Sequence, residues 1–390
     1  MSDIALKHIE YLSVTVGPRG TATDKEREAH DYVENTLKEL GYETHRDSLQ
    51  VAPSIYPVFI LALFVMLVAV WLFYQFKGAG ALAASALGII VAVSTLMELA
   101  LNDNPLRWFL PVAPSQNVYA VAKPAGEAQK KIVVAAHVDT HRTPLIWASP
   151  GMYTVYRVLS TLGMVGLPVG AIVFVIGIFV TNDFLRQIAL GLAVLDGLLL
   201  LMVLQAEFTK HTAGANDNAS GVGVMLSLAA RLKREPLADS EVWFVATAAE
   251  ETGAYGMSDF VRRHEDELDD DTTFLILDSI GGKDTGPCWL RSEMFLLPLN
   301  YPARTLGLAE KIAADRPDLG AYSWTVQGAY SDGAIALKEG FDALTLMNYT
   351  KKGSIPNLHQ PSDTFDRVDP GVVDRTEEFA WEVVRRVDRG

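Results

Sequence analysis

Cysteine is nearly absent from the 390-residue sequence, and so are runs of positive charge. The single cysteine, Cys288, rules out an internal disulfide and is typical of a reducing compartment. The formal net charge is −14 and no basic stripe is present, so the composition argues against a nucleic-acid partner. The stretch before the first apolar run is polar and helical in pattern, so we expect no cleavable secretion signal.

Long apolar runs, in contrast, are frequent. Hydrophobic residues make up 49% of the chain and the mean hydropathy is +0.18, which is high for a wholly soluble protein. Four runs carry few or no charges and are long enough, at about 20 residues, to cross a bilayer as two hairpins. Their approximate bounds are 57–76, 78–97, 158–180 and 188–206. The alternative, a buried helical hairpin of a soluble protein, is weaker because soluble core helices seldom run this long without charge.

Two details of these runs predict how the helices pack. Gly80, Ala84 and Gly88 recur at a spacing that places them on one helix face, which suits close packing in lipid. Asp196 lies near the middle of the fourth run, where a carboxyl group is costly in lipid. We therefore expect Asp196 to face the other helices and to hydrogen-bond a partner such as Ser94 or Thr95.

The rest of the chain has the pattern of an α/β protein. Short strands are expected at 42–51, 117–122, 131–136, 241–248, 273–277 and 343–347. Helices are expected at 3–12, 23–40, 222–232, 255–264, 306–314, 331–338 and 375–387. The alternation predicts a mixed, mostly parallel central sheet with helices on both faces. The short loop Lys123–Lys130 joins the strands at 117–122 and 131–136, so we expect those two strands to be antiparallel neighbours.

We therefore expect one globular domain that carries two membrane hairpins as insertions. The predicted domain comprises residues 1–55, 102–151 and 209–390, transmembrane hairpin 1 comprises 56–101, and transmembrane hairpin 2 comprises 152–208.

Metal-ligand side chains follow several of the predicted strands. They are His137, Asp217, Glu251, Asp278 and His359, each at or just after a strand end or in a following loop. In open α/β sheets the carboxyl ends of strands are where sites are built. Two imidazoles and three carboxylates suit a pair of divalent ions, with zinc the first choice. One carboxylate must then bridge the ions, and Asp217, on a turn between the other ligands, is the natural candidate.

Each of these residues has an ordinary structural explanation when taken alone. A histidine at a strand end is more often a surface or core residue than a ligand, and a Glu-Glu pair is usually a solvated loop. The turn around Asp217 could simply cap the helix that follows it. The ordered set is what points to metal: His137 and Asp278 would hold one ion, and Glu251 and His359 the other.

Six motifs occur in the order H-V-D-T, N-D-N-A-S-G, E-E-T-G, L-D-S-I-G-G, Y-S-D-G and H-Q-P-S-D-T, beginning at His137, Asn216, Glu250, Leu277, Tyr330 and His359. Together they resemble the zinc-dependent peptidases of the M28 family, which are co-catalytic dizinc aminopeptidases and carboxypeptidases. The resemblance covers the chain outside the apolar hairpins and implies a zinc-peptidase/phosphorylase-like fold. It also implies two zinc ions per chain on the five ligands, with Asp217 bridging. By the same resemblance Glu250 is the general base, and Asp139 orients His137.

The function that follows is that of a membrane-anchored dizinc peptidase, most concretely an aminopeptidase. Two such ions can hold a hydroxide and polarise the scissile carbonyl, with Glu250 passing the proton to the leaving amine. One alternative is an amidohydrolase of N-acylated amino acids or lipid-like amides. Another is a non-catalytic receptor or scaffold, which loss of ligands would favour, although none is lost. A single-zinc cyclase is disfavoured because both histidine ligands are present, and an intramembrane zinc protease because no H-E-x-x-H occurs.

The sequence departs from the M28 pattern near the expected substrate pocket. Leu358 precedes His359 where some aminopeptidases carry a tyrosine that supports the tetrahedral intermediate, and Gly333 stands where relatives carry a bulkier residue. The possible substitutes for that tyrosine are Tyr330, Tyr349 and Asn357.

Basic residues near the ends of the apolar runs predict the orientation in the membrane. On the side of the globular domain these are Arg46, Arg107, Arg142, Arg157 and Lys210, whereas the opposite turns offer Lys77 and Arg186. The positive-inside bias places the globular domain in the cytosol of a multi-pass cell-membrane protein. Both hairpins are expected to leave from the sheet edge that holds the metals. The zinc pair would then face the bilayer and favour hydrophobic peptide or amide substrates.

Overall fold

The computed structural model describes the chain except residues 1, 77, 181, 270, 295 and 390. The chain forms two compact units. Unit 1 comprises Met1–Pro53, Val112–His141 and His211–Gly390, and unit 2 comprises Ser54–Pro111 and Arg142–Lys210.

Among its described residues, unit 1 contains a nine-stranded mixed sheet. Its strands are β1 (Thr44–Val51), β2 (Ala113–Ala122), β3 (Lys130–His137), β4 (Ser240–Thr247), β5 (Thr272–Asp278), β6 (Cys288–Glu293), β7 (Leu299–Asn300), β8 (Tyr322–Thr325) and β9 (Asp342–Met347). The order is β1-β2-β4-β3-β5-β9-β6-β7, with β8 paired to β6. The central strands β4, β3, β5 and β9 are parallel, and β1, β2 and β6 add antiparallel pairs. The predicted mixed central sheet is confirmed.

One predicted strand pairing is wrong. The strands at 117–122 and 131–136 run in opposite directions, but they are not neighbours, because β4 lies between β2 and β3. The connecting loop passes over the start of β4, where the backbone N–H groups of Ala125 and Gly126 donate to the carbonyls of Leu237 and Ala238. A loop of this length can span the roughly 10 Å of two strand spacings, so a short loop does not require adjacent strands.

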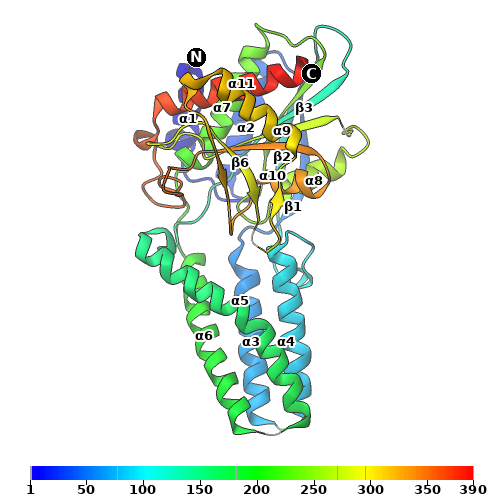
Figure 1. Cartoon of the computed structure of the whole chain (residues 1–390), viewed down its shortest axis with the longest axis vertical. Helices are drawn as coiled ribbons and strands as arrows, with labels where there is room; N and C mark the ends of the chain where they lie inside the picture. The colour runs from blue at the N-terminus through cyan, green and yellow to red at the C-terminus, as the bar shows by residue number, and fades with distance from the viewer. Residues whose placement is uncertain (1, 77, 181, 270, 295, 390) are drawn as a thin grey trace. The chain divides into compact units, whose positions relative to one another are not determined.

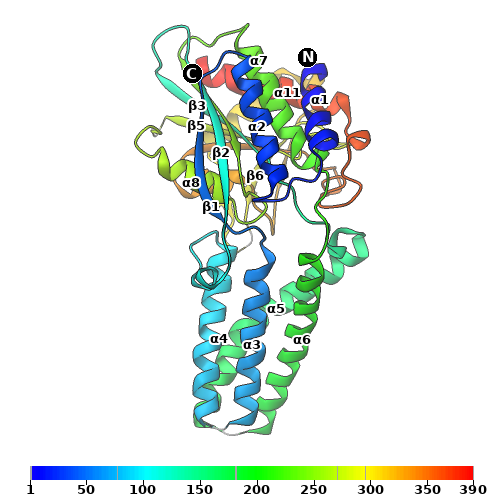
Figure 2. The ribbon, with the colours of Figure 1, turned by 180° about the vertical axis from the view of Figure 1, so that it is seen from behind.

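Helices cover both faces of the sheet. One face carries α1 (Ser2–Glu10), α2 (Asp24–Glu39), α7 (Ser220–Leu232), α9 (Ala303–Asp315) and α11 (Pro370–Arg389). The other carries α8 (Tyr255–Arg263) and α10 (Asp332–Lys338). Figure 2 shows α7 packed beside α1 and α2. This approach depends on Gly223, where an added Cβ would lie 2.7 Å from Ile9 Cγ1.

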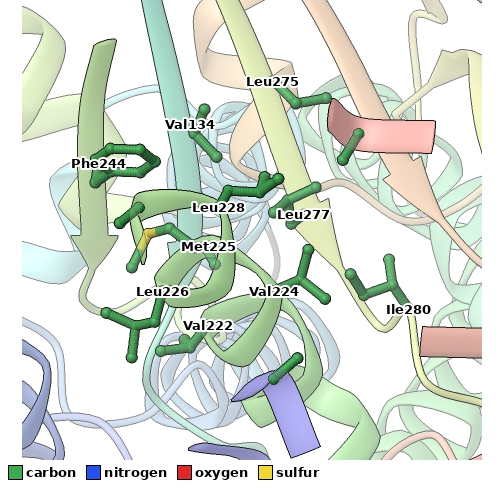
Figure 3. Packing of buried hydrophobic residues seen from close by; sticks show 14 of the residues in the cluster. Val134, Val222, Val224, Met225, Leu226, Leu228, Phe244, Leu275, Leu277 and Ile280 are labelled. Carbon is green, nitrogen blue, oxygen red and sulfur yellow. The ribbon is translucent and has the colours of Figure 1, made fainter. Parts of the chain in front are cut away.

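The main core lies between α7 and the central strands. Figure 3 shows Met225 and Leu228 of α7 among side chains of three different strands, Val134, Phe244 and Leu275. All five side chains are almost completely buried. Because both faces of these strands are covered, they are apolar throughout and do not alternate, which is typical of parallel sheets. This packing fixes the position of the strand ends that follow.

Among its described residues, unit 2 contains four long apolar helices, visible in Figure 1: α3 (Tyr56–Gln75), α4 (Gly78–Leu99), α5 (Pro150–Phe179) and α6 (Asp183–Glu207). Each is long and apolar enough to cross a membrane. Within the unit, α4 packs on α3 and α5, and α6 packs on the same two helices. Both helices of the second predicted hairpin begin earlier than expected, at Pro150 and Asp183, because Ser149 and Asn182 cap them. Lys77, which the orientation argument used, lies outside the described residues.

The predicted small-residue face of α4 is confirmed. Gly80, Ala84 and Gly88 are buried, and a Cβ at Gly88 would lie 3.1 Å from the ring of Phe174 on α5. Asp196 is also buried, as expected. Its expected partners are wrong: within the described part of the chain its Oδ2 has no hydrogen-bond partner, since α6 packs on α3 and α5 and the proposed serine and threonine lie on α4.

Candidate metal centre

The parallel strands bring the predicted ligands to one edge of the sheet. His137 is the last residue of β3 and Asp278 is the last residue of β5, two strands that pair directly. Glu250 and Glu251 follow the end of β4, which pairs with β3 on its other side. Parallel neighbours must end at the same edge, so the three strand ends meet there.

Asp217 is positioned by a carboxylate from a distant part of the chain. The segment Ala215–Ala219 directly precedes α7, and the Asp363 carboxylate accepts the backbone N–H groups of Asn216 at 2.7 Å and Asp217 at 3.0 Å. Asp363 belongs to the same loop as His359, between β9 and α11. One pair of hydrogen bonds therefore holds the loop with Asp217 against the loop with His359.

The two carboxylate oxygens of Asp217 face two histidines from different loops. Its Oδ1 lies 3.4 Å from His137 Nε2, and its Oδ2 lies 3.2 Å from His359 Nε2. On one side, His137 Nε2 also lies 3.8 Å from Asp278 Oδ1. On the other, His359 Nε2 lies 3.4 Å from Glu251 Oε2. The two carboxylate oxygens of Asp217 thus belong to two adjacent groups of donor atoms.

These donor groups have the properties of a divalent-metal site. One cluster of mutually close ligand atoms comes from His137, Asp217 and Asp278, and a second includes Glu251 and His359. His137 Nε2 and Glu251 Oε1 are buried and have no hydrogen-bond partner among the described residues. Several buried carboxylates at one point require positive charge, and imidazole and carboxylate are donors that zinc accepts. The residues present therefore fit such an ion.

Asp139 holds both His137 and the Glu-Glu pair. The ring Nδ1 of His137 lies 3.2 Å from the backbone carbonyl of Asp139. A carbonyl only accepts, so Nδ1 carries the proton and Nε2 keeps its lone pair toward the carboxylates. The Asp139 carboxylate, fully buried, accepts the Thr21 hydroxyl at 2.6 Å and the backbone N–H groups of Glu250 and Glu251 at 3.2 and 3.3 Å. Asp139 therefore contacts more groups than the sequence predicted, which was His137 alone.

The pKa values of Glu250 and Asp217, which have different expected roles, are shifted in opposite directions. Burial raises the pKa of Glu250 well above its usual range, with His137 acting against this shift and Glu251 reinforcing it. Burial would also raise the pKa of Asp217, but the neighbouring imidazoles of His137 and His359 hold it below its usual value. Glu250 therefore retains a proton far more readily than Asp217, a separation typical of sites that assign acid–base work to one carboxylate.

Residues 196–384 match the family model of peptidase family M28. This stretch is similar to the M28 family. Aminopeptidase YwaD of Bacillus subtilis (strain 168) is 31% identical over 166 residues, which are 42% of this chain and 35% of that protein. The alkaline phosphatase isozyme conversion protein of Escherichia coli (strain K12) is 43% identical over 63 residues, 16% of this chain and 18% of that protein. The matches thus span about a third or less of these relatives' own length.

Solved structures show that the fold is shared with a zinc aminopeptidase and with glutaminyl cyclases. A zinc aminopeptidase from Bacillus subtilis superposes with a TM-score of 0.59 at 14% identity, covering 99% of this chain and 94% of that one. Porphyromonas gingivalis glutaminyl cyclase superposes with a TM-score of 0.58 at 15% identity, covering 99% and 97%. At such identities these likenesses establish the fold.

Three further residues at the candidate metal centre carry no recognisable signal in the sequence. His141 lies against the carboxylate of Glu251, with Nδ1 2.9 Å from Oε2. Asp363 lies in the H-Q-P-S-D-T motif, where the sequence alone assigns it no role. Arg19 is completely buried and donates at 2.7, 2.6 and 2.8 Å to backbone carbonyls next to the ligands, those of Val138, Ala213 and Gly214. A lone arginine in a Pro-Arg-Gly turn has no periodicity to reveal it.

The candidates for substrate support differ in where they lie. The Tyr330 hydroxyl donates to the backbone carbonyl of Glu250 at 3.2 Å, which places it at the candidate metal centre. Asn357 accepts from the Ser362 hydroxyl, and the Tyr349 ring stacks on Trp324.

The structure explains why a glycine occupies position 333. A Cβ there would lie 2.3 Å from Thr345 Oγ1 and 2.7 Å from the Tyr301 hydroxyl, so these two side chains occupy the space of the bulkier residue.

Proposed function

We propose that the chain is a zinc-dependent peptidase with a two-ion centre, and specifically an aminopeptidase. The observation that carries this proposal is the convergence of two histidines and two further carboxylates around the two oxygens of Asp217. In the proposed arrangement Asp217 bridges the ions, which the remaining ligands hold in pairs: His137 with Asp278, and Glu251 with His359. The family of residues 196–384 and the aminopeptidase relatives support the same assignment.

When bound, a pair of zinc ions would supply an acidified water and polarise a carbonyl oxygen. The chain's own part in the chemistry rests on Glu250, whose carboxylate would take the proton of the attacking water and deliver it to the leaving amine. Glu250 is fixed for this task because its backbone N–H donates to Asp139 and its carbonyl accepts from the Tyr330 hydroxyl. Of the three candidate residues, Tyr330 is thus the one that we assign to positioning Glu250.

The general-base role can be tested with a single matched pair of variants. Glu250→Gln keeps the size of the side chain but cannot accept a proton, so turnover should fall by about 10²–10⁴-fold, the usual contribution of a general base. Zinc content, measured by elemental analysis, should stay at the wild-type value because Glu250 is not one of the assigned ligands. Glu127→Gln, at an exposed loop position, serves as the control. Full activity in Glu250→Gln would refute the role.

The substrate class needs a separate comparison, because solved structures of this fold include glutaminyl cyclases as well as aminopeptidases. Purified full-length chain in detergent should hydrolyse aminoacyl amides and peptides with a free N-terminus, and should spare the same peptides after acetylation. A preference for N-acylated amino acids or fatty-acyl amides would establish the amidohydrolase alternative instead. Cyclisation of an N-terminal glutaminyl peptide without hydrolysis would establish a cyclase.

We also propose that unit 2 anchors the enzyme in the cell membrane and that unit 1 lies in the cytosol. The apolar length of α3, α4, α5 and α6 supports the anchor, and the bias of basic residues supports the orientation.

Connectivity within unit 1 supports a site that faces the bilayer. The first insertion leaves after β1 and returns at β2, where Val51 pairs with Ala113. The second leaves after His141, beyond the end of β3. Both join unit 1 at the edge that carries the ligands, so we expect hydrophobic peptides to be favoured over polar ones in bilayers.

A further inference from the structure

His141 lies in the loop that follows β3 and is a chemically competent donor that the assigned ligand set does not use. Its Nδ1 lies 2.9 Å from Glu251 Oε2. Its ring stacks on that of His359, with centroids 3.8 Å apart and planes inclined by 25°. The side chain is 11% exposed, so it is largely withdrawn from water. An imidazole in this position touches two of the proposed ligands of one ion.

Three metal-donor atoms lie close together around His141. His141, Glu251 and His359 each offer one ligand atom, and these three atoms lie within 4.8 Å of one another. Beside this group, Asp217 Oδ2 lies 3.2 Å from His359 Nε2. The second oxygen of Glu251, Oε1, is buried without a hydrogen-bond partner in the described part of the chain.

We propose that His141 is an additional protein ligand of the ion held by Glu251, His359 and Asp217. This inference rests on the proposed two-ion function and extends it, because it makes the two sites unequal. The ion at His137 has Asp278 and the shared Asp217 as its other protein ligands, which is the three-ligand set typical of an open catalytic zinc site. The ion at His141 has four protein ligands, the number typical of tightly held zinc. The two ions should therefore bind and leave in two separate steps.

A different role for His141 gives the same contact and must be separated from ligation. The ring could only donate its N–H to Glu251 and so position that ligand. Loss of such a supporting hydrogen bond typically weakens metal binding by about 10–100-fold, so a lower affinity alone does not identify a ligand. Two substitutions divide the roles. His141→Asn keeps an N–H donor of similar reach but is a poor zinc ligand, whereas His141→Cys supplies a strong zinc ligand and no comparable donor.

The experiment uses the full-length chain in detergent, freed of metal and titrated with Co²⁺ and Zn²⁺ against a competing chelator. Wild-type chain should bind two ions with separable affinities. His141→Asn should lose more than about 100-fold in affinity for the tighter ion, a loss beyond that of a supporting hydrogen bond, and should leave the weaker ion in place. His141→Cys should bind both ions, and its Co²⁺ form should show a thiolate-to-cobalt charge-transfer band. His45→Asn, an exposed histidine on β1, is the matched control and should behave as wild type.

The outcomes distinguish a failure of the ligand role of His141 from a failure of the proposed two-ion centre. A wild-type chain that binds no ion, or only one, refutes the two-ion centre itself. A wild-type chain that binds two ions, together with His141→Asn of unchanged affinity or His141→Cys without the thiolate band, refutes only the role of His141 as a ligand. Because the weaker ion binds only in a folded site, its retention in His141→Asn shows that the loss of the tighter ion is not caused by misfolding.

Discussion

Replacing Arg19 by methionine should destabilise unit 1 and weaken metal binding at the same time. Burial lowers the pKa of Arg19 to about 10, so the guanidinium is still a cation at neutral pH. Its three short hydrogen bonds, of 2.7, 2.6 and 2.8 Å, hold the carbonyls of Val138, Ala213 and Gly214. Val138 lies between His137 and Asp139, and Gly214 begins the approach to the Asp217 turn. The arginine thus ties together the two loops that carry ligands.

The size of the effect follows from the groups left without partners. Methionine has a similar length but no hydrogen-bond donor, so three carbonyls lose a partner. Each loss should destabilise the fold by about 1–3 kcal/mol. Relief from burying a charge offsets part of this, which leaves a net loss of about 3–5 kcal/mol. At about 2–4 °C per kcal/mol for a domain of this size, the melting temperature should fall by on the order of 10 °C.

The assay is thermal unfolding of zinc-free chain in detergent, followed by circular dichroism, together with zinc affinity from chelator competition. Arg27→Met is the matched control, because Arg27 is half-exposed on α2 and pairs with Asp24 at the surface. Arg19→Met that melts within about 2 °C of wild type and binds zinc equally well would show that the buried arginine does not support the site.

Three further predictions concern packing, pH and topology. Gly333→Ala should lower the free energy of unfolding by about 1–3 kcal/mol, because its Cβ would lie 2.3 Å from a hydroxyl oxygen. Gly307→Ala, which has open space around it in α9, is the control and should be neutral or stabilising. Equal effects of the two substitutions would contradict the packing at Gly333. Burial raises the pKa of Glu293 from 4.5 to about 7, so its contribution to stability is complete below the lower value and is lost as pH rises through the higher one. Glu293→Gln should therefore reduce the fall in stability between about pH 5 and about pH 8, and an unchanged fall would refute this assignment. Cysteines introduced at Gly78 and Asn182 should react with an impermeant reagent in intact cells if unit 1 is cytosolic, and protection of both positions would contradict that orientation.

The arrangement of the site could be predicted because it depends on local signals. Apolar strands followed at once by histidine or acidic residues gave the positions of His137, Glu251 and Asp278, and parallel pairing then brought those positions to one edge. The turn at Asp217 and the loop of His359 needed the motif order, since neither lies at the end of a strand.

The strand order could not be predicted in the same way. β4 enters between β2 and β3 because of long-range pairing, and no local feature of the short loop at 123–130 records it. Strands β6, β7 and β8 were missed because they are short and carry polar residues such as Arg291 and Ser323. The early start of α5 had a readable signal, a serine cap followed by proline at Pro150.

The supporting residues of the site are the hardest to find from sequence. Arg19 and Asp363 act through backbone carbonyls and N–H groups of segments far away in the chain, and such contacts leave no periodic pattern. His141 is a single histidine in a loop, which in isolation is more often an ordinary surface residue. Only the folded chain shows that it meets Glu251.

The two-ion centre is the central claim, and the number of zinc ions bound per chain tests it most directly. Full-length protein should be loaded with zinc in detergent, freed of unbound metal and measured by elemental analysis against protein concentration. The proposed ligand set predicts two ions per chain, and a loss of metal in Asp217→Ala, because that variant removes the carboxylate shared by both ions. A wild-type chain that holds no zinc, or an Asp217→Ala variant that still holds two ions, would contradict it.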